Sequence, residues 1–270
     1  MENTPVVTAE FLGRTAIITL NNPKKLNALS QDDYYELAKL LRQIAKRDEV
    51  LITLLIGKGR FFSAGADVNR QSSNSEKVEL RRQWIPALAI NNLELANAFY
   101  SHPKILVTAL NGPVIGLSAA IVAHSDLIFA TRDTYLLTPF SSLGLVTEGG
   151  ASVAFVRRMG LSKSKEALLF SHRISVEELQ QTGFVNYILD TPGDCEGFRQ
   201  LVLQELNSRV GDHLVGSSIL QIKQLLRGPS DREFNDQAIK EFFGGLGRFA
   251  EGIPQAEFEK IASGKKKHKL

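Results

Sequence analysis

The chain contains 270 residues with a mass of 29.8 kDa, 43% of them hydrophobic and 23% charged, a composition that excludes disordered and collagen-like classes. The net charge of +3 is small and is concentrated in lysines near the C-terminus, so a nucleic-acid partner is not expected. The single cysteine, Cys195, excludes an intrachain disulfide and a cysteine-based metal site, and the five histidines are too scattered to suggest a zinc site. No apolar run is long enough to span a membrane.

The first part of the chain predicts two strands with a helix between them. Residues 15–20 are rich in β-branched side chains and predict a strand that an Asn-Asn-Pro turn ends. Ser30 with Asp33 forms a capping box at the start of a helix whose apolar residues repeat at helical spacing. Residues 50–56 are apolar without alternation, which predicts a strand covered on both faces.

Two turns of small residues follow, at places where backbone amides can approach a ligand. Residues 64–68 form the first turn, for which a plain tight turn ending in an Asp cap is the alternative. Helical spacing then extends over residues 76–101, where Pro86 is expected to kink or divide the helix. After a third buried strand, residues 111–116 form the second turn, and the unpaired amides of the buried helix that begins near Leu117 form a natural anion site.

A single carboxylate, Glu148, lies in an otherwise uncharged stretch between Asp133 and Arg157 and is followed by two glycines. Burial is therefore expected to raise its pKa, because no nearby cation in the sequence holds it ionised. A carboxyl group that changes protonation near neutral pH is what reversible proton transfer requires. The glycines leave room for a substrate beside the acid. The alternative is that Glu148 caps the helix that follows.

The chain after the acid is mostly helical. Two helices separated by Gly160 precede a third that begins with a capping box at Ser175, and residues 184–189 predict a last strand. Beyond this strand only helices are expected. The sequence therefore predicts a core domain at residues 1–191 and a C-terminal helical region at residues 192–270.

Several short runs combine into a pattern that is more specific than any one of them. They are Asn22-Pro23, residues 26–29, residues 62–67, residues 111–116, residues 143–145 and Glu148-Gly149-Gly150. In this order and spacing they resemble the enoyl-CoA hydratase/isomerase, or crotonase, superfamily. The resemblance implies an α/β fold of the ClpP/crotonase type, in which a spiral of repeated strand-strand-helix units precedes a C-terminal helical trimerisation region, and it implies a homotrimer or hexamer.

The resemblance also implies an acyl-coenzyme A thioester as substrate, with its carbonyl oxygen between the backbone amides of Ala66 and Leu117. Such an oxyanion hole contributes about 3 kcal/mol per donor as charge develops on the oxygen. The residues expected to contact the substrate or its coenzyme A are Ala64, Gly65, Ala66, Asp67, Val68, Lys24, Lys25 and Leu26. The alternatives are solvated surface for the lysines and plain core for the leucine. Coenzyme A enters as part of the substrate, so neither a separate cofactor nor a metal is expected.

Two departures from the family pattern narrow the reaction. Family hydratases use two glutamates, and this chain has Ala120 in place of the first. The family's dienoyl-CoA isomerases use a further acid where this chain has Phe140. The single remaining acid resembles the 3,2-enoyl-CoA isomerases of β-oxidation, in particular the fungal peroxisomal members. In the implied reaction Glu148 moves a proton from C2 of a 3-enoyl-CoA to C4, giving 2-trans-enoyl-CoA, and Asn92 is expected to support it through a water, with a surface position as the alternative.

Other readings of the same pattern are a 2-enoyl-CoA hydratase, another crotonase acyl-CoA enzyme, or an inactive crotonase-fold scaffold subunit. Ala120 argues against hydration, and the retained Glu148 argues against the scaffold. The sequence ends in His268-Lys269-Leu270, which is similar to the Ser-Lys-Leu address that the peroxisomal import receptor binds. We therefore expect a location in the peroxisomal matrix, with a frayed basic tail as the alternative.

Overall fold

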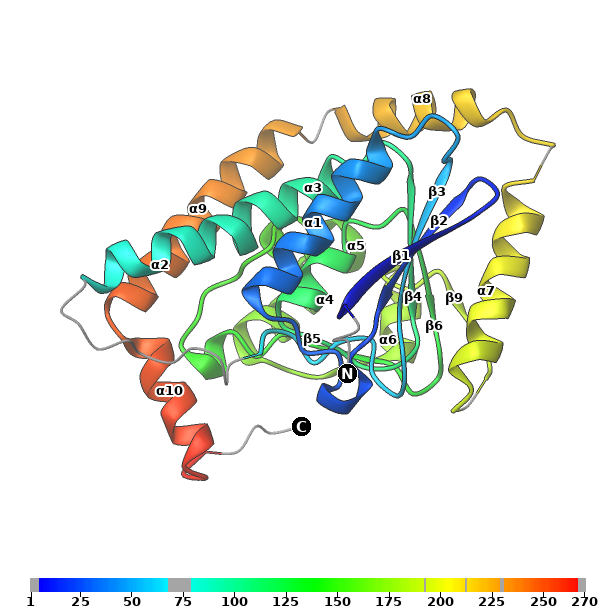
Figure 1. Cartoon of the computed structure of the whole chain (residues 1–270). Coiled ribbons are helices and arrows are strands. Elements are labelled where there is room, and N and C mark those ends of the chain that lie inside the picture. The colour runs from blue at the N-terminus through cyan, green and yellow to red at the C-terminus, as the bar shows by residue number, and fades with distance from the viewer. Residues whose placement is uncertain (1–4, 68–78, 192, 212, 229–230, 267–270) are drawn as a thin grey trace.

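The computed structural model describes residues 5–67, 79–191, 193–211, 213–228 and 231–266. Its main element is a six-stranded sheet with the order β1-β2-β3-β4-β6-β9 (Figure 1). The first pair is antiparallel and every later pair is parallel. The strands are β1 (Val7–Leu12), β2 (Thr15–Leu20), β3 (Ile52–Gly57), β4 (Ile105–Leu110), β6 (Leu127–Ala130) and β9 (Tyr187–Ile188).

A second, smaller sheet has the order β5-β7-β8 and consists of β5 (Val114–Ile115), β7 (Tyr135–Leu137) and β8 (Ile174–Ser175). The sequence did not predict β1, β5 or β8. β1 has one buried residue and ends in four exposed ones, so it lacks an apolar pattern, whereas β5 and β8 have only two residues each. The predicted strands are confirmed, although β9 is shorter than expected because only its central residues pair with β6.

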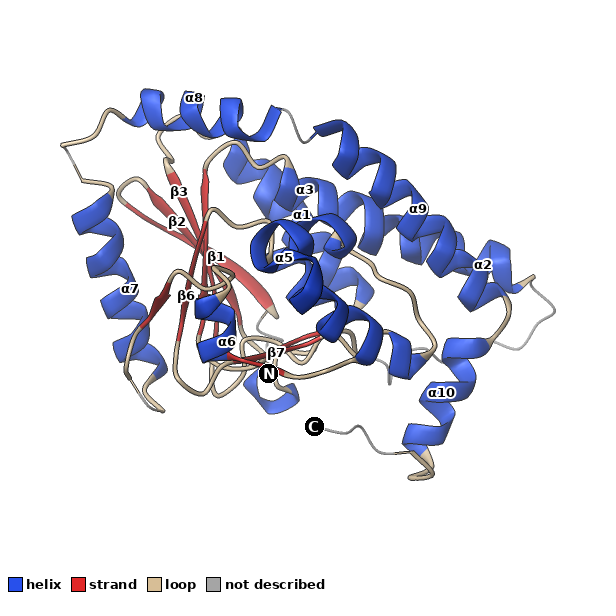
Figure 2. Ribbon diagram, turned by 180° about the vertical axis from the view of Figure 1, so that it is seen from behind, coloured by secondary structure: helices blue, strands red, loops and turns tan. Residues whose placement is uncertain are grey.

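Helices cover both faces of the main sheet. They are α1 (Gln31–Ala45), α2 (Leu80–Leu88), α3 (Ala96–Tyr100), α4 (Leu117–Val122), α5 (Ala151–Phe170), α6 (Val176–Gln181), α7 (Cys195–Arg209), α8 (Gly216–Arg227), α9 (Asp231–Ala250) and α10 (Ile253–Ala262). Figure 2 shows α7 on one side of the sheet and α1 and α5 on the other. Neighbouring strand residues face opposite ways, so Ile17 joins the core under α7 whereas Ile18 joins the core under α1.

The helix boundaries follow the predicted local signals with one exception. Both capping boxes are present, at Ser30 and at Ser175, and Gly160 interrupts α5 with a φ of 73°. The exception is Pro86, because the expected division of the helical stretch comes two residues after it, where α2 ends at Leu88. The chain continues beyond α2 as a π-helical segment, Ala89–Leu95, and then as α3. A proline disrupts the regular hydrogen-bond ladder, and here a change of helix type follows it.

The last helices return to the middle of the chain. α9 packs against α2, the π-helical segment and α5, and both figures show α2 and α9 side by side. The boundary predicted at Thr191-Pro192 falls between β9 and α7, Pro192 lies outside the described residues, and the division into two domains remains a prediction. No helix in the described part of the chain is long and apolar enough to cross a membrane.

Candidate active site

The two predicted turns of small residues lie against each other. Ser63 forms a parallel bridge with Val114, and the amide of Ile115 donates to the Ser63 carbonyl at 3.0 Å. A methyl group built on Gly65 would lie 2.9 Å from the carbonyl oxygen of Ile115, and Gly65 has a φ of 87°. Glycine is therefore required at this contact on both steric and conformational grounds.

Each of the two predicted amide donors directly follows a glycine with a positive φ, Ala66 after Gly65 and Leu117 after Gly116. Leu117 is the first residue of α4, so its N–H has no partner within that helix, and Gly116 before it has a φ of 62°. Ala66 lies in a parallel bridge with Leu29, whose hydrogen bonds run to Gly65 and from Asp67. In this pattern the N–H of Ala66 points away from Leu29. The structure thus brings both predicted donors to adjoining turns.

A buried network of hydroxyl groups, which the sequence did not predict, connects the two turns. The Ser63 hydroxyl donates to the carbonyl of Asn27 at 2.8 Å and accepts the N–H of Gly65 at 3.1 Å. The Ser118 hydroxyl lies 2.8 Å from that of Ser63, and the Tyr34 hydroxyl lies 3.4 Å from Ser118. Since Ser118 belongs to the first turn of α4, this bond joins the helix that carries one predicted donor to the loop that carries the other.

The segment predicted to meet coenzyme A also lies beside the first turn. Residues 23–25 form a short 3-10 helix that exposes Lys24, and the Lys25 ammonium lies 2.9 Å from a carboxylate oxygen of Asp67. The half-buried Leu26 accepts the amide of Ala64 through its carbonyl. The structure therefore brings together all but one of the residues expected to contact the substrate, the exception being Val68, which lies outside the described residues.

Glu148 lies next to the second turn. Its neighbour Gly149 is buried so closely that an added methyl group would lie 2.9 Å from the Leu117 side chain and 3.0 Å from that of Ala120. Glu148 itself is half-buried. Burial, with a smaller contribution from the negative charge of Glu241, raises the pKa of its carboxyl group to about 8. The expectation of a raised pKa is confirmed.

Glu241 is the main feature of the site that sequence reasoning missed. It lies on α9, is only 5% exposed, and accepts the amide of Gly150 at 2.7 Å and that of Ser152 at 2.9 Å. Burial raises its own pKa, and these hydrogen bonds act in the opposite direction. A signal was present, because Glu241 falls in helical phase with the apolar residues of the buried face of α9. These are Phe234, Ala238, Phe242, Leu246 and Phe249.

His124 holds the other side of the same turn. Its Nε2 lies 2.9 Å from the carbonyl oxygen of Gly149, which can only accept, so Nε2 carries the proton. Burial lowers the pKa of His124 to about 4, so the ring is neutral at physiological pH. Its edge packs against the ring of Phe234 from α9. His124 and Glu241 thus form hydrogen bonds to the backbone on either side of the Glu148–Gly150 turn.

Asn92 is buried, contrary to the surface alternative. It is 1% exposed within the π-helical segment, and neither its Oδ1 nor its Nδ2 has a hydrogen-bond partner among the described residues. It packs near Gly245 of α9, where an added methyl group would lie 3.7 Å from Nδ2. A buried amide without a partner commonly binds a water or a ligand group. The link from Asn92 through a water to Glu148 remains a prediction.

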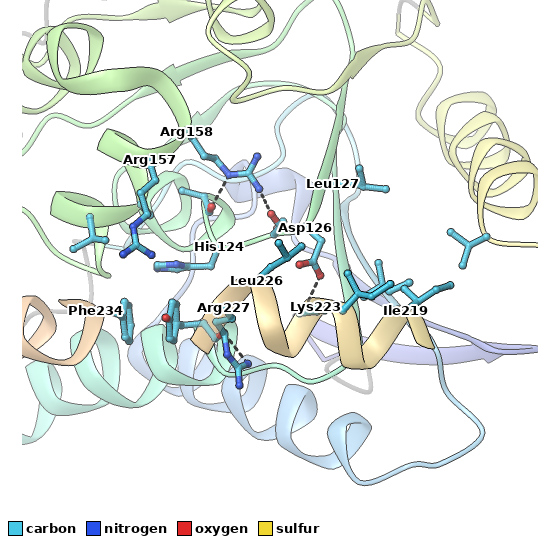
Figure 3. A pocket seen from close by; sticks show the side chains of 18 of the residues that line it. His124, Asp126, Leu127, Arg157, Arg158, Ile219, Lys223, Leu226, Arg227 and Phe234 are labelled. Carbon is cyan, nitrogen blue, oxygen red and sulfur yellow. Dashed lines mark hydrogen bonds and ion pairs between the residues drawn. The ribbon is translucent and has the colours of Figure 1, made fainter. Parts of the chain in front are cut away.

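A cavity of about 650 Å³ lies elsewhere, between β6, α5 and α8. Figure 3 shows the apolar side chains of Ile219 and Leu226 on α8 facing it, with Arg157 and Arg158 on α5 at its other side. None of the predicted site residues lines this cavity. His124 links it to the Glu148 turn, because its ring lines the cavity and its Nε2 bonds to Gly149, and the cavity-lining Ala154 donates its amide to the Gly150 carbonyl. The described residues contain no group of three or more His, Cys, Asp or Glu that could hold a metal.

Comparisons with known proteins give a consistent family. The model of the family described as "Enoyl-CoA hydratase/isomerase" matches residues 11–245. A Pyricularia oryzae protein named Delta(3,5)-Delta(2,4)-dienoyl-CoA isomerase is 52% identical over 98% of this chain and 99% of its own. A Saccharomyces cerevisiae protein named 3,2-trans-enoyl-CoA isomerase is 35% identical over 94% of this chain and 93% of its own. The crystal structure of an enoyl-CoA hydratase/isomerase from Pseudoalteromonas atlantica has the same fold, with a TM-score of 0.81 and 22% identity over 98% of this chain and 100% of that one.

Proposed function

Because the chain belongs to the enoyl-CoA hydratase/isomerase family, we propose that it is an isomerase that moves a carbon–carbon double bond in an enoyl-CoA thioester. Both relatives described above are named isomerases and align with nearly the whole chain. The observation that carries the proposal is Glu148, a half-buried carboxyl group with a pKa of about 8 beside two turns that present backbone amides. Near neutral pH such a group is available as both base and acid, as a reversible proton transfer requires.

The proposed reaction converts a 3-enoyl-CoA to the 2-trans-enoyl-CoA. Ionised Glu148 removes a proton from C2, and the electron pair of that C–H bond moves toward the thioester carbonyl. The amides of Ala66 and Leu117 donate to the carbonyl oxygen and stabilise the dienolate. Protonated Glu148 then returns the proton to C4 as the double bond moves to C2, so one carboxyl group completes the cycle. Coenzyme A enters with the substrate along Lys24, Lys25 and the first turn, and the reaction needs no separate cofactor.

A second candidate is the conversion of a 3,5-dienoyl-CoA to the 2,4-dienoyl-CoA, which the name of the Pyricularia relative favours. That reaction moves a proton further along the acyl chain, so a second exchangeable acid is useful. The position where family members carry this acid holds the buried Phe140. Glu241 is a second carboxyl group, but both of its oxygens accept backbone amides, which favours the one-acid reaction.

Three substrates distinguish the two candidate isomerisations from hydration and from an inactive scaffold. The purified protein is incubated with 3-hexenoyl-CoA, 2-hexenoyl-CoA and 3,5-octadienoyl-CoA, and the conjugated thioester absorbance and product masses are followed. Conjugation of the first without hydration of the second supports the proposal, and turnover of the diene alone supports the second candidate. Water addition to 2-hexenoyl-CoA identifies a hydratase, and no reaction with any of the three supports the scaffold reading.

The same proposal includes self-association as a homotrimer or hexamer. Support comes from α8, where Ile222, Leu225 and Leu226 are 56%, 76% and 76% exposed, an unusual density of large apolar side chains on one surface helix. Sedimentation of the purified protein tests it, since Leu225→Glu with Leu226→Glu is expected to shift the protein to smaller species. A monomeric wild-type protein would contradict this part of the proposal.

We also propose a peroxisomal location, for which support comes from the sequence alone. His268-Lys269-Leu270 lies outside the described residues and remains a predicted address for the import receptor. A fluorescent protein fused in front of residues 259–270 is expected to enter peroxisomes, and the same fusion without the last three residues is expected to stay in the cytosol. Equal distributions of the two fusions would contradict the address.

A further inference from the structure

The position of Glu241 is unusual for a charged residue. It is 5% exposed, and no Lys or Arg in the described part of the chain lies within ion-pair distance of it. Its carboxylate is held instead by the backbone amides of Gly150 and Ser152, which belong to a segment about ninety residues earlier. A buried carboxylate without a cation is costly to maintain. The two amides lie at the N-terminal end of α5, where the helix dipole and free N–H groups favour negative charge.

The segment that Glu241 holds is the one that carries Glu148. Gly149 and Gly150 have φ values of 69° and 79°, and Gly149 lies against the Leu117 and Ala120 side chains of α4. Glycine gains this conformation easily and leaves it easily. The turn therefore depends on external contacts to stay in one conformation, and these contacts are Glu241 on one side and His124 on the other.

We propose that Glu241 is a positioning residue for proton transfer, which fixes the Glu148–Gly150 turn through the amides of Gly150 and Ser152 and keeps a negative charge close to Glu148. This inference rests on the proposed function of Glu148. Two observations support it independently, the two short hydrogen bonds and the contribution of the Glu241 charge to the raised pKa of Glu148. Glu241 is not itself a proton donor or acceptor for the substrate, because both of its oxygens are occupied and the side chain is enclosed.

The other titratable groups near Glu148 do not change charge in the pH range of interest. Tyr34 on α1 is the nearest of them electrostatically, and burial raises its pKa far above neutral. His124 after α4 has a pKa lowered to about 4 by burial. Neither Tyr34 nor His124 therefore changes charge between about pH 5 and pH 9, the range around the raised pKa of Glu148.

The test compares the wild-type protein with Glu241→Gln, which keeps the size of the side chain but removes its charge and one of its two acceptors. The pH dependence of kcat/KM for 3-hexenoyl-CoA is expected to rise with a midpoint near 8 in the wild type, because Glu148 must be ionised to remove a proton. In the variant the midpoint is expected to fall by about half a unit to one unit. The plateau kcat is expected to fall about tenfold to a hundredfold with KM changed less, since misplacing a catalytic group affects the transition state most.

Two further variants keep the result interpretable. Asp236→Asn removes a negative charge from the exposed face of the same helix, where the side chain is 61% exposed, and is expected to change neither plateau nor midpoint. Glu241→Asp keeps the charge but lacks the methylene needed to reach both amides, so its plateau is expected to fall while its midpoint stays near 8. An unchanged midpoint or an unchanged plateau in a folded Glu241→Gln would overturn the proposal, and if that variant fails to fold, wild-type turnover in Glu241→Asp would overturn it.

A readout without turnover separates this inference from the proposed function. The Glu148 carboxyl carbon can be titrated by NMR, with its signal identified by its loss in Glu148→Gln. A Glu148 titration that moves to lower pH in Glu241→Gln supports the coupling even if the wild type converts none of the substrates. An unmoved titration overturns the coupling even if the wild type is an active isomerase.

Discussion

The two amide-bearing turns and the Glu148 turn lie side by side but are held in place by different means. The first two are built by neighbouring strands and by glycines that allow close approach, as where Gly65 meets Ile115. The Glu148 turn has two flexible glycines of its own and is fixed by side chains from other elements, Glu241 and His124. Backbone geometry thus places the two turns that we propose to bind the thioester carbonyl, whereas side chains from distant parts of the chain place Glu148.

The largest effect is expected for Glu148→Gln, which removes the proton carrier and leaves both turns intact. We expect kcat for 3-hexenoyl-CoA to fall by about a thousandfold or more, because the variant has lost its acid–base group. Binding of the product thioester, measured by calorimetry, is expected to change little because the amide donors and the coenzyme segment remain. Substantial turnover by the variant would show that another group carries the proton.

Gly65→Ala disturbs the contact between the two amide-bearing turns. The new methyl group would lie 2.9 Å from the Ile115 carbonyl oxygen at a φ of 87°, so the two turns must separate or rotate. We expect kcat/KM to fall about a hundredfold, the scale of losing one oxyanion donor.

Gly13→Ala is the matched control for that variant. Gly13 also has a positive φ, of 56°, but an added methyl group would meet nothing within 4 Å. It is therefore expected to carry the conformational strain without the loss of activity. Equal activity losses in the two variants would mean that strain, and not the contact between turns, matters.

A smaller effect is expected for Ser118→Ala, which removes the hydroxyl between the two turns. The 2.8 Å bond to Ser63 is lost, so the spacing of the two amide donors is less firmly fixed. We expect kcat to fall about tenfold with a modest change in KM. Tyr34→Phe removes only the longer 3.4 Å contact and is expected to cost less, and the reverse order would contradict the role assigned to the Ser63–Ser118 bond.

A separate effect, on stability and not on turnover, concerns Glu148→Gln as a function of pH. Because the pKa of Glu148 is raised from 4.5 to about 8, the folded protein keeps a proton that the unfolded chain loses, and wild-type stability falls as pH rises through this window. The variant has no such titration. Above pH 8 it is expected to exceed the wild type by about 1 to 3 kcal/mol in free energy of unfolding, a value reduced for the partial exposure of Glu148.

Urea denaturation at pH 5 and pH 9 measures this difference directly. The advantage of the variant is expected to be present at the higher pH and nearly absent at the lower one. An advantage of equal size at both would show that the ionisation of Glu148 is not its cause.

Much of the fold could be predicted from the sequence because its signals are local. The capping boxes at Ser30 and Ser175, the break at Gly160 and the apolar strand at β3 each depend on residues within one turn or one strand. The two turns of small residues were predicted for the same reason, whereas the pairing of their amides was implied only by the family resemblance. The division expected at Pro86 occurs as a change to a π-helical segment after Leu88, and propensity alone does not predict this type of helix.

The sequence could predict that burial raises the pKa of Glu148, but not that the charge of Glu241 also raises it. Glu241 lies about ninety residues away, on a helix whose approach to α5 is set by packing. A surface position was the alternative for Asn92 because asparagine is usually exposed. The packing of α9 against the π-helical segment buries it instead. Helical phase could have shown that Glu241 is buried, but no local pattern in the chain shows which distant segment it contacts.

The contact between α9 and the start of α5 also sets an order of events during synthesis. Strands β1 to β7, both amide turns and α5 are all encoded before residue 171, so they can form while the C-terminal helices are still being translated. The hydrogen bonds from the Gly150 and Ser152 amides to Glu241 can form only after Glu241 has left the ribosome. The nascent chain therefore acquires the two turns that we propose to bind a thioester before it acquires the contact that completes the turn of Glu148.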